Sequence, residues 1–136
     1  MSAMAAELPK LLLIDSNVFF AKRLSEALKH EGFEVEHCTQ SAYALTALEW
    51  NTPAAILCAT NLREMGAYEI PRILHGDIKT AHIPIIAMTA HVLADEQEKC
   101  LAAGMNAHLG KPLDVQELYA TLQECLRLPR RRRKGW

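Results

Sequence analysis

The stretch Ala54-Ala55-Ile56-Leu57-Cys58-Ala59-Thr60-Asn61 decides how this chain folds. The apolar run from Ala54 to Ala59 stops at polar residues, and a helical pattern begins near Gly66. A short run of this kind, bounded by turn signals, predicts a strand buried on both faces, as in parallel sheets. In such sheets the carboxyl ends of the strands carry the chemistry. At that end this strand offers Ala59, which has only a methyl group.

Strand and helix patterns alternate along the rest of the chain. The other predicted strands are Leu11–Ile14, Phe33–Cys38, His82–Met88 and Ala107–Leu109, and helices are predicted near residues 20–28, 41–50, 68–74, 95–101 and 115–125. Gly32 should end the first helix. Five such repeats with short connections predict a three-layer α/β sandwich. Right-handed crossovers with helices on both faces favour a doubly wound, parallel five-stranded sheet in the flavodoxin-like order 2-1-3-4-5.

The composition is that of an ordinary globular domain. Of the 136 residues, 50% are hydrophobic and 23% are charged, which suits one domain with a normal core. No apolar run approaches the roughly 20 residues of a membrane span, and the first residues lack the pattern of a signal peptide. The four cysteines are far apart in sequence and form no C-x-x-C pair, which fits a reducing compartment. We therefore expect a cytoplasmic protein.

Basic residues are unevenly distributed along the chain. Arg130 to Lys134 supply five of the fifteen, so the ten others face sixteen acidic residues and the body of the chain is acidic. We expect residues 1–9 to be an N-terminal extension, residues 10–128 the folded domain and residues 129–136 a basic tail. The tail is either solvated or binds nucleic acid or an anionic surface. One short basic run without interleaved aromatic residues favours a solvated tail.

Polar residues follow the predicted strands in an ordered series. Asp15 comes after the first strand, Met65-Gly66-Ala67-Tyr68-Glu69 after the third, Thr89-Ala90 after the fourth and Lys111-Pro112 after the fifth. In this order and spacing they resemble a response-regulator receiver domain of two-component signalling, over nearly the whole chain. The segment from Glu98 to Pro112 is similar to receivers attached to hybrid sensor kinases and to single-domain receivers.

The resemblance assigns roles to these positions, and the chain departs from several of them. In the family, two neighbouring acidic residues after strand one hold Mg²⁺, an aspartate ending strand three accepts phosphate, and a Thr or Ser and a Lys contact the phosphoryl group. Here the acceptor position is Ala59, and the acidic pair is reduced to Asp15 with Ser16 beside it. Arg63 replaces the usual proline, and His108 replaces the aromatic residue of strand five. The resemblance thus implies a vestigial phosphorylation pocket of Asp15, Ser16, Ala59, Asn61, Thr89, Lys111 and Pro112.

These departures argue against aspartyl phosphorylation. A methyl group cannot act as a nucleophile. Asp15 and the carbonyl of Asn61 are too few ligands for Mg²⁺, so we expect no cofactor, with Mg²⁺ bound at most weakly, and no enzymatic activity. Ser16 or Thr60 would have to replace the acceptor, but strand alternation turns Thr60 away from position 59 and Ser16 has no evident general base.

Other reactive residue types receive structural interpretations. Cys58 is expected to pack in the core rather than to sense redox changes, because burial lowers thiol reactivity. The six histidines form no metal-ligand spacing and are expected at the surface, with His108 as the exception. We expect Lys111 to reach Asp15 in a surface-type pair of ~0.2–1 kcal/mol, and the Lys111–Pro112 bond to be cis, as the resemblance implies.

The leading hypothesis is a degenerate receiver that acts as a phosphorylation-independent interaction module. Its partner would be a sensor kinase, an output protein or another receiver, including a second copy of the chain in a homodimer. By resemblance, the partner face includes Val92, Leu93, His108 and Tyr119. One alternative is a module that binds a small anion at the carboxyl edge of the sheet. Another is a nucleic-acid accessory that acts through residues 130–134.

Overall fold

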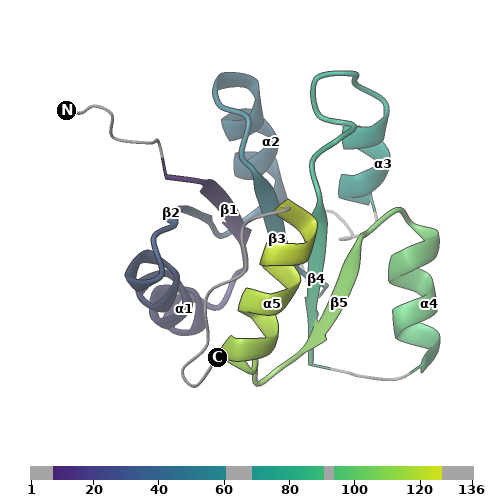
Figure 1. Cartoon of the computed structure of the whole chain (residues 1–136). Coiled ribbons are helices and arrows are strands. Elements are labelled where there is room, and N and C mark those ends of the chain that lie inside the picture. The colour runs from purple at the N-terminus through teal and green to yellow at the C-terminus, as the bar shows by residue number, and fades with distance from the viewer. Residues whose placement is uncertain (1–7, 61–68, 91–93, 127–136) are drawn as a thin grey trace.

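The computed structural model describes residues 8–60, 69–90 and 94–126 (Figure 1). Within these ranges five strands alternate with five helices. In chain order they are β1 (Lys10–Ile14), α1 (Val18–His30), β2 (Glu34–Cys38), α2 (Ser41–Trp50), β3 (Ala55–Ala59), α3 (Glu69–His75), β4 (Ile85–Thr89), α4 (Ala94–Ala102), β5 (Ala107–Gly110) and α5 (Val115–Leu126).

The strands form one parallel sheet in the order β2-β1-β3-β4-β5, which confirms the predicted topology. β3 lies at the centre and all its residues are buried, whereas β2 at the edge is only partly buried. In Figure 1, α5 crosses in front of the sheet and α2 lies behind it. The hydroxyl of Tyr119 on α5 donates a hydrogen bond to Ala27 O on α1 over 3.1 Å, so these two helices share one face.

Local signals explain the first βα unit. The side chain of Asn17 accepts a hydrogen bond from Phe20 N over 3.1 Å and caps α1. Leu24 and Leu28 give the helix its buried stripe. Gly32 follows the helix with φ of 93°, a backbone conformation that favours glycine, so the predicted stop is confirmed.

The fourth strand is shorter at its start than predicted. It begins at Ile85 rather than His82, because the preceding residues form turns. Thr80 Oγ1 donates to Leu74 O over 2.7 Å, and Ile83 N donates to Thr80 O over 3.1 Å. These bonds hold the chain in a bend, and Pro84 has no N–H with which to extend the sheet.

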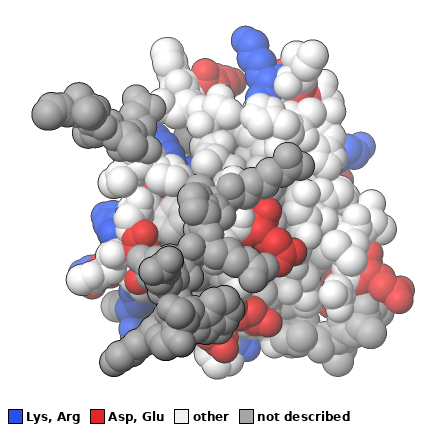
Figure 2. Space-filling model, viewed as in Figure 1, with Lys and Arg blue, Asp and Glu red and all other residues white. Residues whose placement is uncertain are grey.

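Charged side chains are spread over the face seen in Figure 2, and acidic ones gather over α5. This helix carries Glu117 and Glu124 on its exposed side and has no Lys or Arg between Val115 and Leu126. The acidic character expected for the body is therefore visible on this face. No helix in the described part of the chain is both long and apolar enough to cross a membrane.

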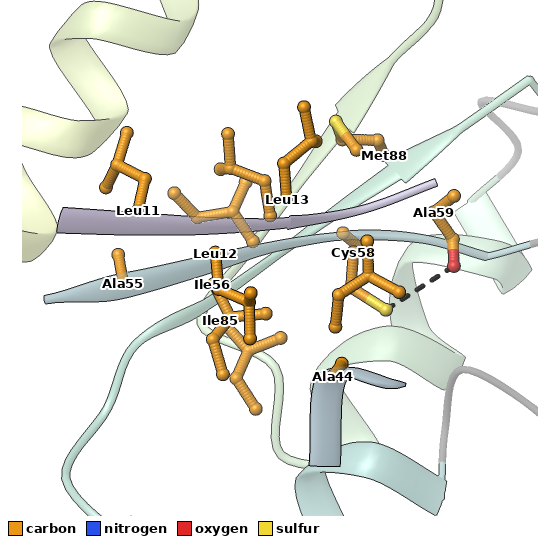
Figure 3. Close-up of a cluster of buried hydrophobic side chains, with 14 of the residues drawn as sticks. Leu11, Leu12, Leu13, Ala44, Ala55, Ile56, Cys58, Ala59, Ile85 and Met88 are labelled. Carbon is orange, nitrogen blue, oxygen red and sulfur yellow. Dashed lines mark hydrogen bonds between the residues drawn. The ribbon is translucent and has the colours of Figure 1, made fainter. Parts of the chain in front are cut away.

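The core packs against both faces of the sheet (Figure 3). Toward α2 and its Ala44 point Ile56, Cys58 and Ile85, and toward the opposite face point Leu11, Leu13 and Met88. Each fully buried Leu or Ile side chain stabilises the fold by about 1.5–3 kcal/mol. Cys58 is fully buried, and desolvation, with smaller effects of Asp15 and Cys100, raises the pKa of its thiol to about 12. The core role predicted for Cys58 is confirmed.

Candidate functional site

The carboxyl ends of four strands bring the predicted site residues to one edge of the sheet. The register pairs Ile14 with Cys58 and Ala59 with Met88, so Asp15 and Ala59 end neighbouring strands. β4 and β5 continue the same edge, because Lys111 N donates to Thr89 O over 2.7 Å. The convergence expected from parallel-sheet geometry is present for these residues.

Asp15 makes several of the polar contacts at this edge of the sheet. Its side chain is 1% exposed, and each carboxylate oxygen accepts one hydrogen bond. Oδ1 accepts from Asn17 N over 2.9 Å, and Oδ2 accepts from Lys111 Nζ over 2.7 Å. The Asp15 backbone is also fixed, since its N–H donates to Cys38 O over 3.0 Å and its carbonyl lies 2.8 Å from His37 Nε2.

Lys111 links two elements through its ammonium group. Besides the bond to Asp15, Nζ lies 4.2 Å from the centre of the Phe20 ring on α1, within the range of a cation–π interaction. The Lys111–Pro112 bond is cis, as predicted. The contact with Asp15 is confirmed, but its description as a surface-type pair was wrong. The lysine side chain is 18% exposed and the aspartate 1%, so the pair is largely withdrawn from water.

The residue that ends β3 is fully buried. Ala59 has no exposed surface, and its carbonyl accepts a weak hydrogen bond from the Cys58 thiol over 3.5 Å. Thr89 is also buried, whereas Ser16 is exposed and Thr60 is half-buried. Predicted site residue Asn61 lies outside the described residues.

Three residues at the site were not predicted to take part in it. Asn17 precedes and Phe20 begins the first predicted helix, with no role expected at the site, and His37 was expected at the surface. His37 is half-buried and binds the Asp15 carbonyl. Its signal in the sequence was its place near the end of an edge strand that pairs with β1.

The other histidines divide into two groups. His30, His75 and His82 are exposed, as expected, and His91 lies outside the described residues. His108 on β5 is half-buried, and its Nε2 is buried with no hydrogen-bond partner among the described residues.

Two members of the predicted partner face lie within the described residues. Tyr119 is half-buried, and its hydroxyl donates to Ala27 O on α1. His108 remains a candidate for the face, and Val92 and Leu93 lie outside the described residues. Residues 130–134 also lie outside them, so the interpretations of the tail stay predictions.

Among the described residues, the donor set at this edge does not fit Mg²⁺. The ion requires near-octahedral oxygen coordination, usually from one or two carboxylates with water and phosphate. Both oxygens of Asp15 already accept hydrogen bonds, and the side chain of Ala59 has no oxygen to offer as a ligand. In residues 8–60, 69–90 and 94–126, no group of three His, Cys, Asp or Glu side chains could hold a metal ion.

Comparisons with known proteins agree with this fold. Histidine kinase 1 of Arabidopsis thaliana is 35% identical over 97 residues, which are 69% of this chain but only 8% of that protein. The polar-differentiation response regulator DivK of Brucella anthropi is 26% identical over 120 residues, 88% of this chain and 98% of DivK. The solved receiver domain of sensor histidine kinase PA1611 from Pseudomonas aeruginosa, with a magnesium ion in its active-site cleft, superposes with a TM-score of 0.81 at 29% identity and covers 88% of this chain and 98% of its own. The model of the response regulator receiver domain matches residues 11–123, and the chain therefore belongs to this family.

Proposed function

We propose that this receiver domain of two-component signalling works as a protein–protein interaction module without aspartyl phosphorylation. Ala59 is the observation that carries the proposal. Phosphoryl transfer to a receiver needs a nucleophilic oxygen at the end of β3, and a buried methyl group has no electron pair to donate. The domain then signals by binding a partner protein through its surface.

The surroundings of Ala59 support the same reading. A second acidic residue beside Asp15 is missing, since Ser16 stands there, and the Asp15 oxygens already bind Asn17 and Lys111. A serine hydroxyl needs a general base to become a nucleophile. Asp15 is the neighbouring carboxylate, and its oxygens already accept hydrogen bonds, so it is not available as a general base for the exposed Ser16.

The alternative of a small-anion binder receives less support. It relied on Thr89 and on the ammonium of Lys111 to hold an anion. That ammonium is already neutralised by Asp15 at 2.7 Å, and Thr89 is buried. An incoming anion would have to displace an internal carboxylate that is preorganised for the same cation.

Intact-mass spectrometry after incubation with acetyl phosphate and Mg²⁺ tests the proposal. The wild-type mass should stay unchanged. Ala59→Asp should also stay unmodified, because Ser16 leaves the metal short of a ligand. The matched positive variant, Ala59→Asp with Ser16→Asp, restores both the acceptor and the second acid and should gain one acid-labile phosphate. A stoichiometric acid-labile phosphate on the wild type would refute the proposal, and mapping it would identify Ser16 or Thr60.

The partners that fit such a module are a sensor kinase, an output protein or another receiver. The candidate binding face contains His108, together with Val92 and Leu93 of the predicted set. His108→Glu should weaken binding to the cognate partner, whereas His82→Glu places the same charge at an exposed site before β4 and serves as the control. Equal binding by both variants would exclude this face.

A further inference from the structure

The charges at the carboxyl edge of the sheet are balanced without any added ion. Asp15 is the carboxylate that the described residues place there, and the Lys111 ammonium binds its Oδ2 over 2.7 Å. Because the Asp15 side chain is 1% exposed and both its oxygens accept hydrogen bonds, a cation at Asp15 would compete with the groups already bound. One buried negative charge is thus neutralised by one internal positive charge.

We infer that Lys111 is the resident cation of this pocket and that its ammonium excludes Mg²⁺ from Asp15. The inference rests on the proposed function in treating the pocket as one that no phosphoryl group enters. It extends that function, because it makes the folded domain independent of the divalent cation as well as of the phosphoryl donor.

The ammonium is held from two sides, which makes it difficult to displace. It loses the Asp15 hydrogen bond and the face of the Phe20 ring, 4.2 Å away, if it leaves. Phe20 is itself positioned by the cap of α1, since its N–H donates to Asn17 Oδ1 over 3.1 Å. The Asn17 N–H in turn occupies Asp15 Oδ1. The same short segment therefore blocks one carboxylate oxygen and supports the cation on the other.

Electrostatic repulsion adds to this steric exclusion. A divalent ion at Asp15 would stand next to the Lys111 ammonium, and like charges at such short range repel strongly in a site with little water. Mg²⁺ also gives up its own water reluctantly, so it gains little from a carboxylate with no free oxygen. Removal of the ammonium should reverse both effects and leave a buried carboxylate that attracts a cation.

Metal binding in the absence of any phosphodonor tests the inference. The probes are Mg²⁺, read by the thermal unfolding midpoint, and Mn²⁺, read by paramagnetic broadening of the Asn17 amide signal. Millimolar Mg²⁺ should leave the wild-type midpoint unchanged, and Mn²⁺ should not broaden the signal selectively. In Lys111→Met, Mn²⁺ should bind on the order of tenfold more tightly or better, because an adjacent unit charge is removed, and Mg²⁺ should raise the midpoint.

Two further variants keep the test decisive. Lys111→Gln removes the charge while its amide can still donate to Asp15, so it should gain Mn²⁺ affinity in the same direction but less than Lys111→Met, and it replaces that variant if Lys111→Met does not fold. Lys10→Met removes the more exposed pair with Glu36, at 3.1 Å, from the other end of β1, and should gain no metal response.

A wild-type domain that binds Mn²⁺ at Asp15, or a folded Lys111 variant with no gain in affinity, would overturn the inference. The proposed function fails separately. Metal binding without phosphorylation would remove this inference alone, whereas an acid-labile phosphate on wild-type protein would remove the proposed function.

Discussion

Replacing Lys111 with Met removes the ammonium that neutralises a carboxylate with a 1% exposed side chain. Breaking a buried pair from one side leaves an uncompensated charge and typically costs about 3–5 kcal/mol of the free energy of unfolding. Asp15→Asn should cost less, about 1–3 kcal/mol. It leaves the lysine, whose side chain is 18% exposed and ends a flexible stem that can turn toward water.

A double variant measures the interaction energy between Asp15 and Lys111 separately from the effect of each single substitution. With Asn at position 15 and Met at position 111 no charge is stranded, so the double variant should be more stable than the sum of the single losses implies, by about 1–3 kcal/mol. Urea unfolding followed by circular dichroism gives the three free energies. For a chain of 136 residues, the loss in Lys111→Met should lower the thermal midpoint by roughly 10–18 °C.

The more exposed pair between Lys10 and Glu36 provides the matched control. Their side chains are 25% and 41% exposed, and Lys10→Met should cost only about 0.2–1 kcal/mol. A loss of the same small size in Lys111→Met, with no coupling in the double variant, would refute the reasoning. The pair would then behave as the surface pair that the sequence suggested.

Three smaller predictions concern other parts of the fold. Between pH 9 and 12 the Cys58 thiol is ionised in the unfolded chain, where its pKa is the ordinary 9.0, but stays protonated in the folded chain. The free energy of unfolding should therefore fall by up to about 1.4 kcal/mol per pH unit as the pH rises. In urea unfolding, Cys58→Ala should show a shallower dependence on pH. Gly32→Ala should cost about 1–2 kcal/mol from backbone strain, and Gly104→Ala should cost a similar amount in the same assay, because its φ is 105° and the exposed His75 ring beside it can turn away. Ser41→Ala should raise the free energy of unfolding by about 0.5 kcal/mol, because the buried Ser41 Oγ has no partner among the described residues; a loss of stability would show that this hydroxyl is bonded.

The fold was predictable because its signals are local. A continuous apolar run identified β3, and a cap at Asn17 with a stop at Gly32 bounded α1. The start of β4 was not predictable in the same way. It depends on the Thr80 hydroxyl binding Leu74 O six residues earlier, a contact that no periodicity encodes.

The site was predictable at the level of which residues end which strand. The approach of Lys111 to Asp15 follows from that alone and is confirmed. The burial of the pair, the ring of Phe20 beside it and the bond from His37 depend on how α1 and β2 pack against β1. The orientation of Tyr119 depends likewise on α1, so a family pattern could not place its hydroxyl.

The departures of this chain from the receiver pattern form one electrostatic arrangement. Lys111 forms a neutral pair with Asp15. Ala59 and Ser16 therefore belong together, because either carboxylate restored alone would add a negative charge beside a pair that is already balanced. A charge buried at position 59 would lack a counter-ion of its own and would compete with Asp15 for the ammonium. Restored together, the two carboxylates add two negative charges, which one divalent cation can neutralise, so the acceptor and the second acid have to be restored together before phosphorylation can return.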